Sequence, residues 1–338
     1  MINKTLLFLD NTYPEPYQLS SLTKKAIGGT EASIIKSALI LSKKYRVFVA
    51  QKFRSEPHVE NPQLSFIPKT QITQIKPDII IVLRKAPLLK KLRNQFPKAK
   101  IYLWLHTYKN YEYVLKRPLL NSTKTELICN SATHMLHTGK LLNSTLMARI
   151  FSLFLKKTKV HFCYNPINKP ELKKCHRDIN KLLFFSSPNK GLDQVLECFN
   201  SIRKKLPDLK LYVANPGYKD NELDLSGDNI KYLGSLPYQE IIQHLNESLC
   251  VFYPQDVFSE TFGLIYAEAH AQGTAIIAHD IGSAKEIMDK NNPPINVNDL
   301  DLIVQTIKKW QRNYPQVNYN EKFSDKNVFN QWTKVLNQ

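Results

Sequence analysis

Short apolar runs alternate with amphipathic stretches along nearly the whole chain of 338 residues. The stretch Ala32–Ser42, for example, repeats its apolar residues at helical spacing between two such runs. Regular alternation of strand-like and helix-like segments predicts parallel sheets covered by helices on both faces. The expected strands are Thr5–Leu9, Tyr45–Ala50, Ile79–Leu83, Ile101–Leu105, Glu126–Cys129, Val160–Cys163, Lys181–Phe185, Lys210–Val213, Ile230–Tyr232, Leu249–Tyr253 and Thr274–Ala278.

These strands are too many for one ordinary domain, so two Rossmann-like domains are expected. The boundary is placed near Asn165, where Pro166 and Pro170 interrupt the periodic pattern. The expected fold class is therefore α/β, with an N-terminal domain at 1–165 and a C-terminal domain at 166–310. Residues 311–338 are expected to form a helical segment that packs back toward the N-terminal domain.

The apolar runs are far shorter than the roughly 18 residues that span a bilayer. The first run, Thr5–Leu9, is followed at once by Asp10 and is too short for a signal peptide, so it is interpreted as a buried strand. We therefore expect a cytoplasmic protein. Its five cysteines show no metal-type spacing, which indicates reduced thiols and no structural zinc.

The chain carries a formal net charge of +18, and the excess lies in its first half. Residues 1–165 contain 27 Lys and Arg against 8 Asp and Glu, whereas residues 166–338 contain 20 against 21. One cationic stretch is 84–93. A positive charge concentrated in one half of the chain gives information about its binding partners rather than about its fold. A general compositional bias toward Lys is the alternative, but it should act on both halves.

Two glutamates, Glu260 and Glu268, stand eight residues apart around Gly263. If Phe262 and Gly263 begin a helix, its first N–H groups and its dipole make an anion site that suits a diphosphate. Glu260 would then accept hydrogen bonds from sugar hydroxyls, and Glu268 would reach a ribose diol. The alternative is that Glu260 only caps the helix and Glu268 is solvated.

This segment resembles the Glu-x7-Glu pattern of the retaining glycosyltransferases of the GT-B fold, in their family 4. The Gly-x-x-x-Glu stretch of that family is matched by 282–286, its strand-then-glycine element by 228–234 and its Lys-Gly motif by 189–192. Together these motifs cover most of residues 181–290. The resemblance implies two Rossmann-like domains that face each other across a cleft.

In the first domain the resemblance is thinner. Gly28 and Gly29 match the glycine-rich loop of the family, and glycines there let the backbone approach a phosphate or sugar. His106 follows an expected strand, where the family often has a histidine that faces the donor sugar. The alternative is an ordinary histidine at a strand end.

The resemblance implies retention of anomeric configuration without an enzyme nucleophile, with the N-terminal domain on the acceptor side. The implied catalytic residues are Glu260, His106 and Lys190. The implied donor-binding residues are Gly28, Gly29, Ser187, Lys190, Glu260, Thr261, Phe262, Gly263, Leu264 and Glu268. The family's phosphate-binding arginine is missing here, which leaves Lys190, backbone N–H groups and Ser187 to bind the diphosphate.

The expected activity is transfer of a hexose from a nucleotide-diphosphate sugar, with UDP favoured, to a glycan or lipid-linked acceptor. No metal or other cofactor is expected. The Asp299-Leu300-Asp301 motif is interpreted as a helix N-cap rather than a metal site. The alternatives are a GT-B epimerase or phosphorylase, a sugar-binding module without catalysis, and a nucleic-acid binder. Nucleic acid is not favoured, because no RRM, zinc-finger or KH signature is present.

The last expectation concerns the basic half. Leu142, Leu146, Ile150 and Phe154 fall on one helical face with cations at both ends. Basic amphipathic helices bind anionic lipid surfaces, so we hypothesise peripheral association with the inner face of a membrane. The alternative is that this apolar face packs against the sheet and the lysines are solvated.

Overall fold

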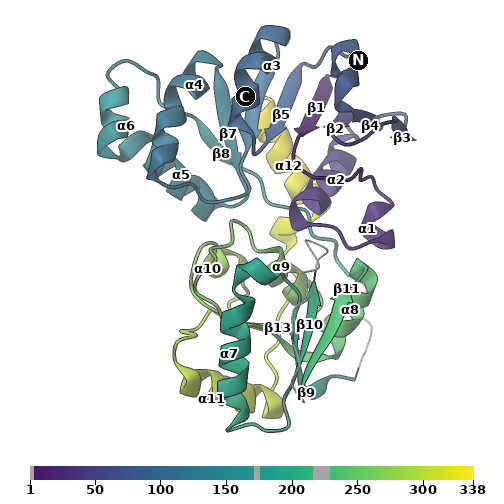
Figure 1. Ribbon diagram of the computed structural model, residues 1–338, viewed down its shortest axis with the longest axis vertical. Coiled ribbons are helices and arrows are strands. Elements are labelled where there is room, and N and C mark those ends of the chain that lie inside the picture. The colour runs from purple at the N-terminus through teal and green to yellow at the C-terminus, as the bar shows by residue number, and fades with distance from the viewer. Residues whose placement is uncertain (1–3, 171–175, 216–228) are drawn as a thin grey trace. The chain divides into compact units, whose positions relative to one another are not determined.

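A computed structural model describes residues 4–170, 176–215 and 229–338 (Figure 1). The chain forms two compact units. The first comprises Met1–Leu19, Thr30–Pro166 and Asp325–Gln338, and the second comprises Ser20–Gly29 and Ile167–Ser324. This division differs from the expected boundaries in two places: residues 20–29 group with the second unit, and the expected segment 311–338 is divided between the units.

The first unit is built on an eight-stranded sheet with the order β3-β4-β2-β1-β5-β6-β7-β8. Its strands are β1 Thr5–Asp10, β2 Arg46–Gln51, β3 His58–Asn61, β4 Leu64–Pro68, β5 Ile79–Leu83, β6 Lys100–Trp104, β7 Thr125–Cys129 and β8 Val160–Phe162. All neighbours are parallel except β3 and β4, and Leu7 of β1 pairs with Ile80 of β5.

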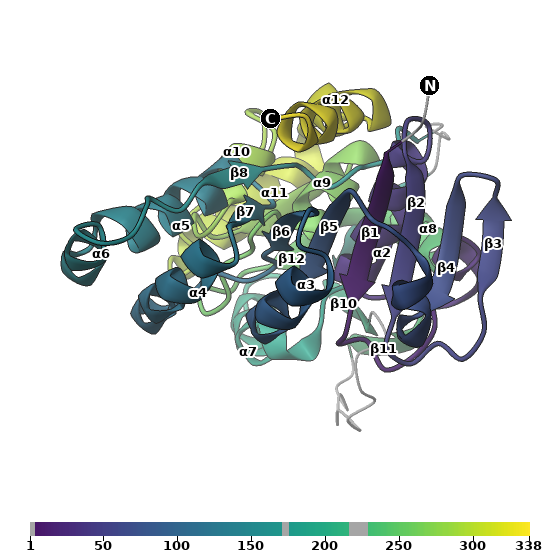
Figure 2. The same ribbon diagram turned by 90° about the horizontal axis from the view of Figure 1, so that it is seen from above.

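Both faces of this sheet are covered. The α-helices are α2 Gly29–Leu41, α3 Leu89–Gln95, α4 Arg117–Ser122, α5 Ala132–Ser144, α6 Leu146–Phe151 and α12 Asp325–Leu336, with 3-10 helices at Lys69–Gln74, Ala86–Leu88 and Tyr111–Lys116. Leu7 and Leu9 pack in one cluster with residues of α3, α4 and α5. Phe8 points to the opposite face and contacts Trp332 of α12. Figure 2 shows α12 on one side of the strands and α3 and α4 on the other.

The C-terminal helix α12 is part of the first unit because its apolar face is buried there. Trp332 is fully buried, and its ring meets that of Trp104 edge-on at 5.0 Å. The Tyr102 hydroxyl donates to the Val335 carbonyl at 2.8 Å, which fixes the end of the helix. The helical segment expected within 311–338 thus includes α12, whose buried residues are Val328, Trp332, Val335 and Leu336.

The second unit has a five-stranded parallel sheet with the order β11-β10-β9-β12-β13. Its strands are β9 Asp178–Phe184, β10 Lys210–Asn215, β11 Ile230–Ser235, β12 Ser248–Tyr253 and β13 Ala275–Ala278. Its α-helices are α1 Ser21–Lys24, α7 Leu192–Arg203, α8 Tyr238–Glu247, α9 Leu264–Ala271, α10 Ala284–Ile287 and α11 Leu300–Arg312, with 3-10 helices at Pro188–Lys190 and Glu321–Phe323.

All of the strands expected from the sequence are present, with ends shifted by a few residues at most. Two strands were not predicted, β3 and β4, which form an antiparallel hairpin at the edge of the first sheet. β3 consists of the sequence HVEN and is only partly buried, so it lacks the apolar run that identifies an inner strand. The α/β fold class is confirmed.

Three further expectations concern side chains. Cys129, Cys163, Cys198 and Cys250 are buried free thiols, while Cys175 lies outside the described residues. Asp299 caps α11, accepting from the Leu302 N–H at 2.9 Å, which confirms the N-cap interpretation. Within the described ranges, no helix is long and apolar enough to cross a membrane.

Candidate functional site

In doubly wound sheets, ligands bind at the carboxyl ends of the strands where the strand order reverses. In the second unit this point lies between β9 and β12, because the chain builds β9, β10 and β11 in one direction and then adds β12 and β13 on the other side. The segments that follow these two strands are 185–191 and 254–263. They contain Lys190 and Glu260, the two residues expected to carry donor binding and catalysis.

Lys190 and Glu260 form an ion pair, with 2.8 Å between Lys190 Nζ and Glu260 Oε1. The Tyr253 hydroxyl donates to the same carboxylate oxygen at 3.3 Å, and the Lys190 ammonium lies 4.8 Å from the centre of the Phe258 ring. The Lys190 side chain is 29% exposed and that of Glu260 is 10% exposed. A pair that solvent can reach from the lysine side is able to exchange its partner for an anionic ligand.

The backbone around Glu260 is held by the Gly282–Ser283 turn. The Ser283 N–H donates to the Glu260 carbonyl at 3.0 Å, and the Ser283 hydroxyl lies 2.9 Å from that oxygen and 2.8 Å from the Phe262 carbonyl. A Cβ added to Gly282 would be 2.6 Å from the Glu260 carbonyl oxygen. The 282–286 motif therefore supports the Glu260 loop from behind.

Helix α9 begins at Leu264, one or two residues later than predicted. Gly263 precedes it with φ of 79°, a conformation that favours glycine, and no side chain caps the helix. The alternative interpretation of Glu260 as a helix cap is therefore wrong. The first backbone N–H groups of α9 have no partner within the helix. Leu264 lies against Gly29 of the same unit, where an added Cβ would be 2.7 Å from Leu264 Cδ1.

Glu268 lies one turn further along α9 and is partly buried. Burial, and next the charge of Glu268, raise the pKa of Tyr238 well above its usual value. This places the Glu268 carboxylate close to the first residue of α8. Glu268 is thus not the fully solvated residue of the alternative interpretation.

The remaining expected donor-binding residues are buried near this loop. Ser187 precedes the 3-10 helix Pro188–Lys190, and its carbonyl accepts from the Lys190 N–H at 2.9 Å. Thr261 and Gly28 are also buried, and the ring of Phe262 packs edge-on against that of Phe323 at 5.0 Å. The arrangement favours a packing role for Phe262.

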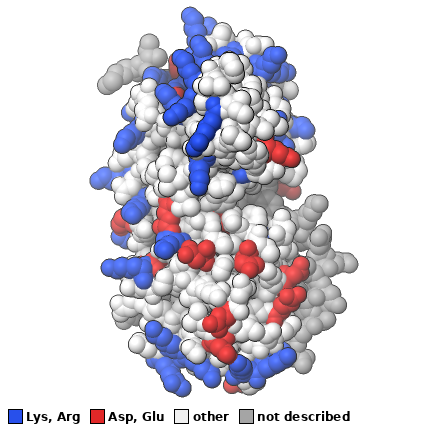
Figure 3. All heavy atoms as spheres, turned by 90° about the vertical axis from the view of Figure 1, so that its left-hand side faces the viewer, with Lys and Arg blue, Asp and Glu red and all other residues white. Residues whose placement is uncertain are grey.

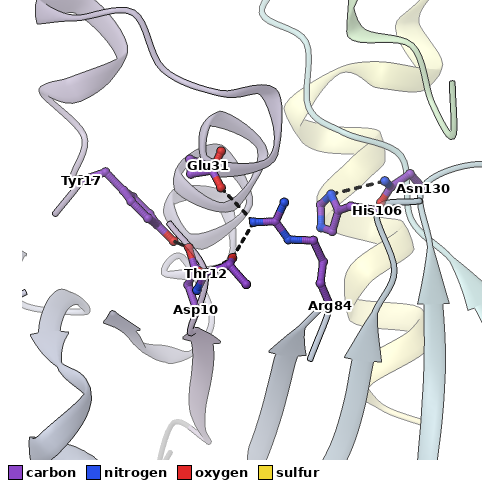
Figure 4. Close-up of polar contacts among 7 residues, drawn as sticks. All are labelled: Asp10, Thr12, Tyr17, Glu31, Arg84, His106 and Asn130. Atoms are coloured by element: carbon purple, nitrogen blue, oxygen red, sulfur yellow. Dashed lines mark hydrogen bonds and ion pairs between the residues drawn. The ribbon is translucent and has the colours of Figure 1, made fainter. Parts of the chain in front are cut away.

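The first unit has its own reversal of strand order, between β1 and β5. Figure 4 shows the polar side chains that gather there. Asp10 ends β1 and accepts hydrogen bonds from the Thr12 hydroxyl at 2.7 Å and the Tyr17 hydroxyl at 2.9 Å. Arg84 follows β5 and donates to Thr12 Oγ1 at 2.6 Å and to Glu31 Oε1 at 3.1 Å.

Arg84 occupies an unusual backbone conformation, with φ of 59°. Left-handed backbone costs a non-glycine residue roughly 1–2 kcal/mol, so its neighbours must hold it there. Glu31 is fully buried, and the guanidinium neutralises it while remaining 28% exposed. The cluster is a strained and charged constellation at the edge where ligands bind.

His106 follows β6 in the same unit, and a neighbouring amide defines its tautomer (Figure 4). Trp104 Nε1, which can only donate, lies 2.6 Å from Asn130 Oδ1, so Asn130 Nδ2 faces His106 Nδ1 at 3.4 Å. An amide N–H directed at Nδ1 leaves the ring proton on Nε2. Burial, and next the charge of Arg84, lower the pKa of His106 well below 6.5. The imidazole is therefore neutral, with its proton on Nε2.

Sequence reasoning missed the cluster of Asp10, Thr12, Tyr17 and Arg84. Asp10 was interpreted only as the acid that ends the first strand, and Arg84 only as part of a basic stretch. A usable signal was present, because Asp10 and Arg84 directly follow the expected strands Thr5–Leu9 and Ile79–Leu83. Recognising it required the strand order, which the sequence pattern does not give.

Residues 181–327 match the family described as Glycosyl transferases group 1. A GDP-mannose-dependent monoacylated alpha-(1-6)-phosphatidylinositol monomannoside mannosyltransferase of Corynebacterium glutamicum is 32% identical over 111 residues. A phosphatidyl-myo-inositol mannosyltransferase of Mycolicibacterium smegmatis is 23% identical over 107 residues. These matches cover 29% and 31% of this chain, and the chain spans only 28% of each relative's length.

Two solved structures are similar over nearly the whole chain. HepE of Anabaena, in complex with UDP and glucose, matches with a TM-score of 0.65 and 14% identity, covering 99% of both chains. Sucrose-phosphate synthase of Thermosynechococcus elongatus matches with a TM-score of 0.63 and 13% identity, covering 98% of this chain and 95% of the other. At such identities the likeness establishes the fold. Residues 181–327 are thus similar to the glycosyl transferases group 1 family, and the two Rossmann-like units of the chain have the GT-B fold.

Proposed function

We propose that this protein is a retaining glycosyltransferase that moves a hexose from a nucleotide-diphosphate sugar to a glycan or lipid-linked acceptor. The observation that carries the proposal is the Lys190–Glu260 pair at the strand-order reversal of the second unit. A cation, a carboxylate and a helix N-terminus at this point meet the needs of a diphosphate and the sugar attached to it.

The proposed reaction breaks the bond between the sugar C1 and the diphosphate oxygen. The acceptor oxygen bonds to C1 on the same face, and its proton passes to the departing diphosphate. Lys190 and the N–H groups at the start of α9 stabilise the charge that develops on the leaving group. Glu260 orients the sugar, Glu268 binds the ribose, and His106 donates from Nε2 to a sugar hydroxyl. None of these roles needs a metal ion.

We propose UDP as the nucleotide, with GDP as the main competitor. The name of the Corynebacterium relative specifies GDP-mannose, whereas HepE was solved with UDP and glucose. The names of both mannosyltransferases contain a phosphatidylinositol acceptor. A lipid-linked acceptor would bring the enzyme to a membrane surface, so the proposal includes peripheral association with the inner face of a membrane.

A nucleotide screen tests donor binding. Thermal unfolding is measured with UDP, GDP, ADP and their sugars, and the cognate donor should raise the midpoint because it binds only the native state. No shift with any of these compounds would refute the proposal.

A transfer assay tests the reaction. The cognate donor should release free nucleotide only with an acceptor present, and product NMR should show the donor's anomeric configuration. Activity should persist in a chelator. Glu260→Gln should nearly abolish transfer, whereas Glu240→Gln, an exposed carboxylate on α8, should not. Turnover of the sugar without an acceptor would instead support the epimerase alternative.

A further inference from the structure

Helix α6 and the turn after it form a projecting segment, 144–157, between α5 and β8 of the first unit. Two hydrogen bonds close its base: Asn143 Nδ2 donates to the Thr158 carbonyl, and the Thr158 N–H donates to Asn143 Oδ1, both at 3.0 Å. Because the Asn143 side chain bonds both the N–H and the carbonyl of Thr158, the two ends of the segment are held next to each other.

The inner side of the segment is packed. Ala148 is buried against Val114 and Leu141, with Met147 and Phe151 alongside them. The buried Arg117 donates to the Ala148 carbonyl, to Ser152 Oγ at 3.1 Å and to the Lys156 carbonyl at 3.0 Å. These bonds define the path of the turn, so the orientation of its outer side is set by the fold.

The outer side exposes large apolar side chains. Leu146 is 75% exposed, Ile150 54%, Leu153 76% and Phe154 82%. Single exposed apolar residues are ordinary on protein surfaces, but four within nine residues form a patch that marks an interaction site. The alternative that the predicted face packs against the sheet is wrong for three of its four residues, since only Leu142 is buried.

The charged side chains in the sequence around this patch are all cationic. Residues 132–160 contain five Lys and Arg and no Asp or Glu. Arg149, Lys156 and Lys157 are exposed within the segment, and Lys159, which pairs with Glu126 at 3.5 Å, is exposed just after it. Figure 3 shows the side of the molecule that carries α6, where Lys and Arg predominate around uncharged surface in the upper half, with Asp and Glu at its right-hand edge.

We propose that segment 144–157 is a docking element that inserts Leu146, Ile150, Leu153 and Phe154 into an anionic lipid surface, while the neighbouring cations bind the headgroups. Charge complementarity identifies the partner. A bilayer with anionic headgroups combines an apolar interior with surface anions, and these two features match the exposed apolar side chains and the cations of the segment. This inference deepens the proposed peripheral location, but lipid binding requires neither donor nor acceptor.

Vesicle co-sedimentation of the full chain at low salt tests the element. Wild type should bind vesicles of phosphatidylcholine with phosphatidylglycerol, should bind pure phosphatidylcholine far less, and should be released by salt. Replacing both Leu153 and Phe154 by Asp should lower the partition coefficient at least about tenfold. Replacing Lys156 and Lys157 by Gln should lower it about fivefold per cation.

Matched controls come from the same unit. Val59→Asp changes an apolar side chain that is 68% exposed on β3, and the Lys43→Gln/Lys44→Gln variant removes two exposed cations after α2. Both controls should bind as wild type does. Circular dichroism confirms that every variant is folded.

Three results would overturn the inference. These are no binding of wild type to anionic vesicles, equal binding of the segment and control variants, and a wild-type dimer that the Asp substitutions make monomeric without any lipid binding. Transfer to a soluble acceptor should be unchanged in the segment variants. A protein that binds vesicles but transfers no sugar would refute the proposed function and leave the docking element standing.

Discussion

Breaking the Lys190–Glu260 pair should change nucleotide binding in opposite directions, depending on which partner is replaced. The charge-assisted contact of Lys190 with a diphosphate is worth on the order of 1.5–3 kcal/mol. In the free protein, however, its ammonium already lies 2.8 Å from Glu260. That pair is partly solvated, so breaking it costs up to about 1 kcal/mol. Lys190→Ala should therefore weaken UDP or GDP binding by about 0.5–3 kcal/mol, roughly twofold to 150-fold.

Glu260→Gln should tighten binding of the same nucleotide. The substitution releases Lys190 from its partner and removes a negative charge next to the diphosphate. The gain should be about 0.5–1 kcal/mol, a twofold to fivefold lower Kd. Transfer should nevertheless fall, because the sugar loses its orienting carboxylate. In the double variant, Glu260→Gln should give a smaller gain, because no lysine remains to be released and only the removal of the negative charge contributes.

Isothermal titration calorimetry with the nucleoside diphosphate and with the nucleoside alone measures this cycle. The nucleoside has no phosphate, so its affinity should be nearly the same in all four proteins. Weaker diphosphate binding by Glu260→Gln, or equal losses for nucleoside and diphosphate in Lys190→Ala, would show that the pair is structural and would refute the reasoning.

Three further predictions follow from local structure. Gly263→Ala should destabilise the protein by about 2–5 kcal/mol, because its Cβ would be 2.2 Å from a tyrosine ring in addition to the left-handed backbone strain. Gly273→Ala, with φ of 69° and open space, should cost only about 1–2 kcal/mol, and equal losses in urea unfolding would contradict this difference. Arg84→Met should lower the free energy of unfolding by about 2–4 kcal/mol, because it leaves the buried Glu31 carboxylate without its guanidinium. The loss should be smaller than for a fully buried pair, since Arg84 is 28% exposed. A loss below about 1 kcal/mol in urea unfolding would show that other groups satisfy the carboxylate. Burial lowers the pKa of His134 from 6.5 to about 3. Between these two pH values the unfolded chain is protonated at His134 and the native state is not, so the free energy of unfolding decreases as the pH falls below about 6.5. His134→Gln should reduce that slope by about 1.4 kcal/mol per pH unit between pH 6 and pH 4, and an unchanged slope would disprove it.

Much of the second unit's site was predictable, because its residues lie within short local motifs. Lys190 lies six residues after the end of β9, and Glu260 lies four residues before the start of α9. Because both distances along the chain are short, the sequence spacing is enough to place the two residues at the carboxyl edge of the sheet. The helix start was placed one or two residues early. The reason is that left-handed Gly263 adds a turn, which an apolar pattern does not reveal.

By itself, the sequence determined the alternation of strands and helices and hence two parallel sheets, because periodicity of apolar residues is a local property of the chain. It also determined which half carries the positive charge. Only the tertiary structure decided that Asp10 and Arg84 meet, since strand order depends on long-range pairing between β1 and β5. Likewise, the pattern grouped Leu142 with Leu146, Ile150 and Phe154. Leu142 is buried because it packs in the core cluster of the sheet. The other three are exposed, in a turn whose path is set by hydrogen bonds from Arg117, 31 to 39 residues earlier in the chain.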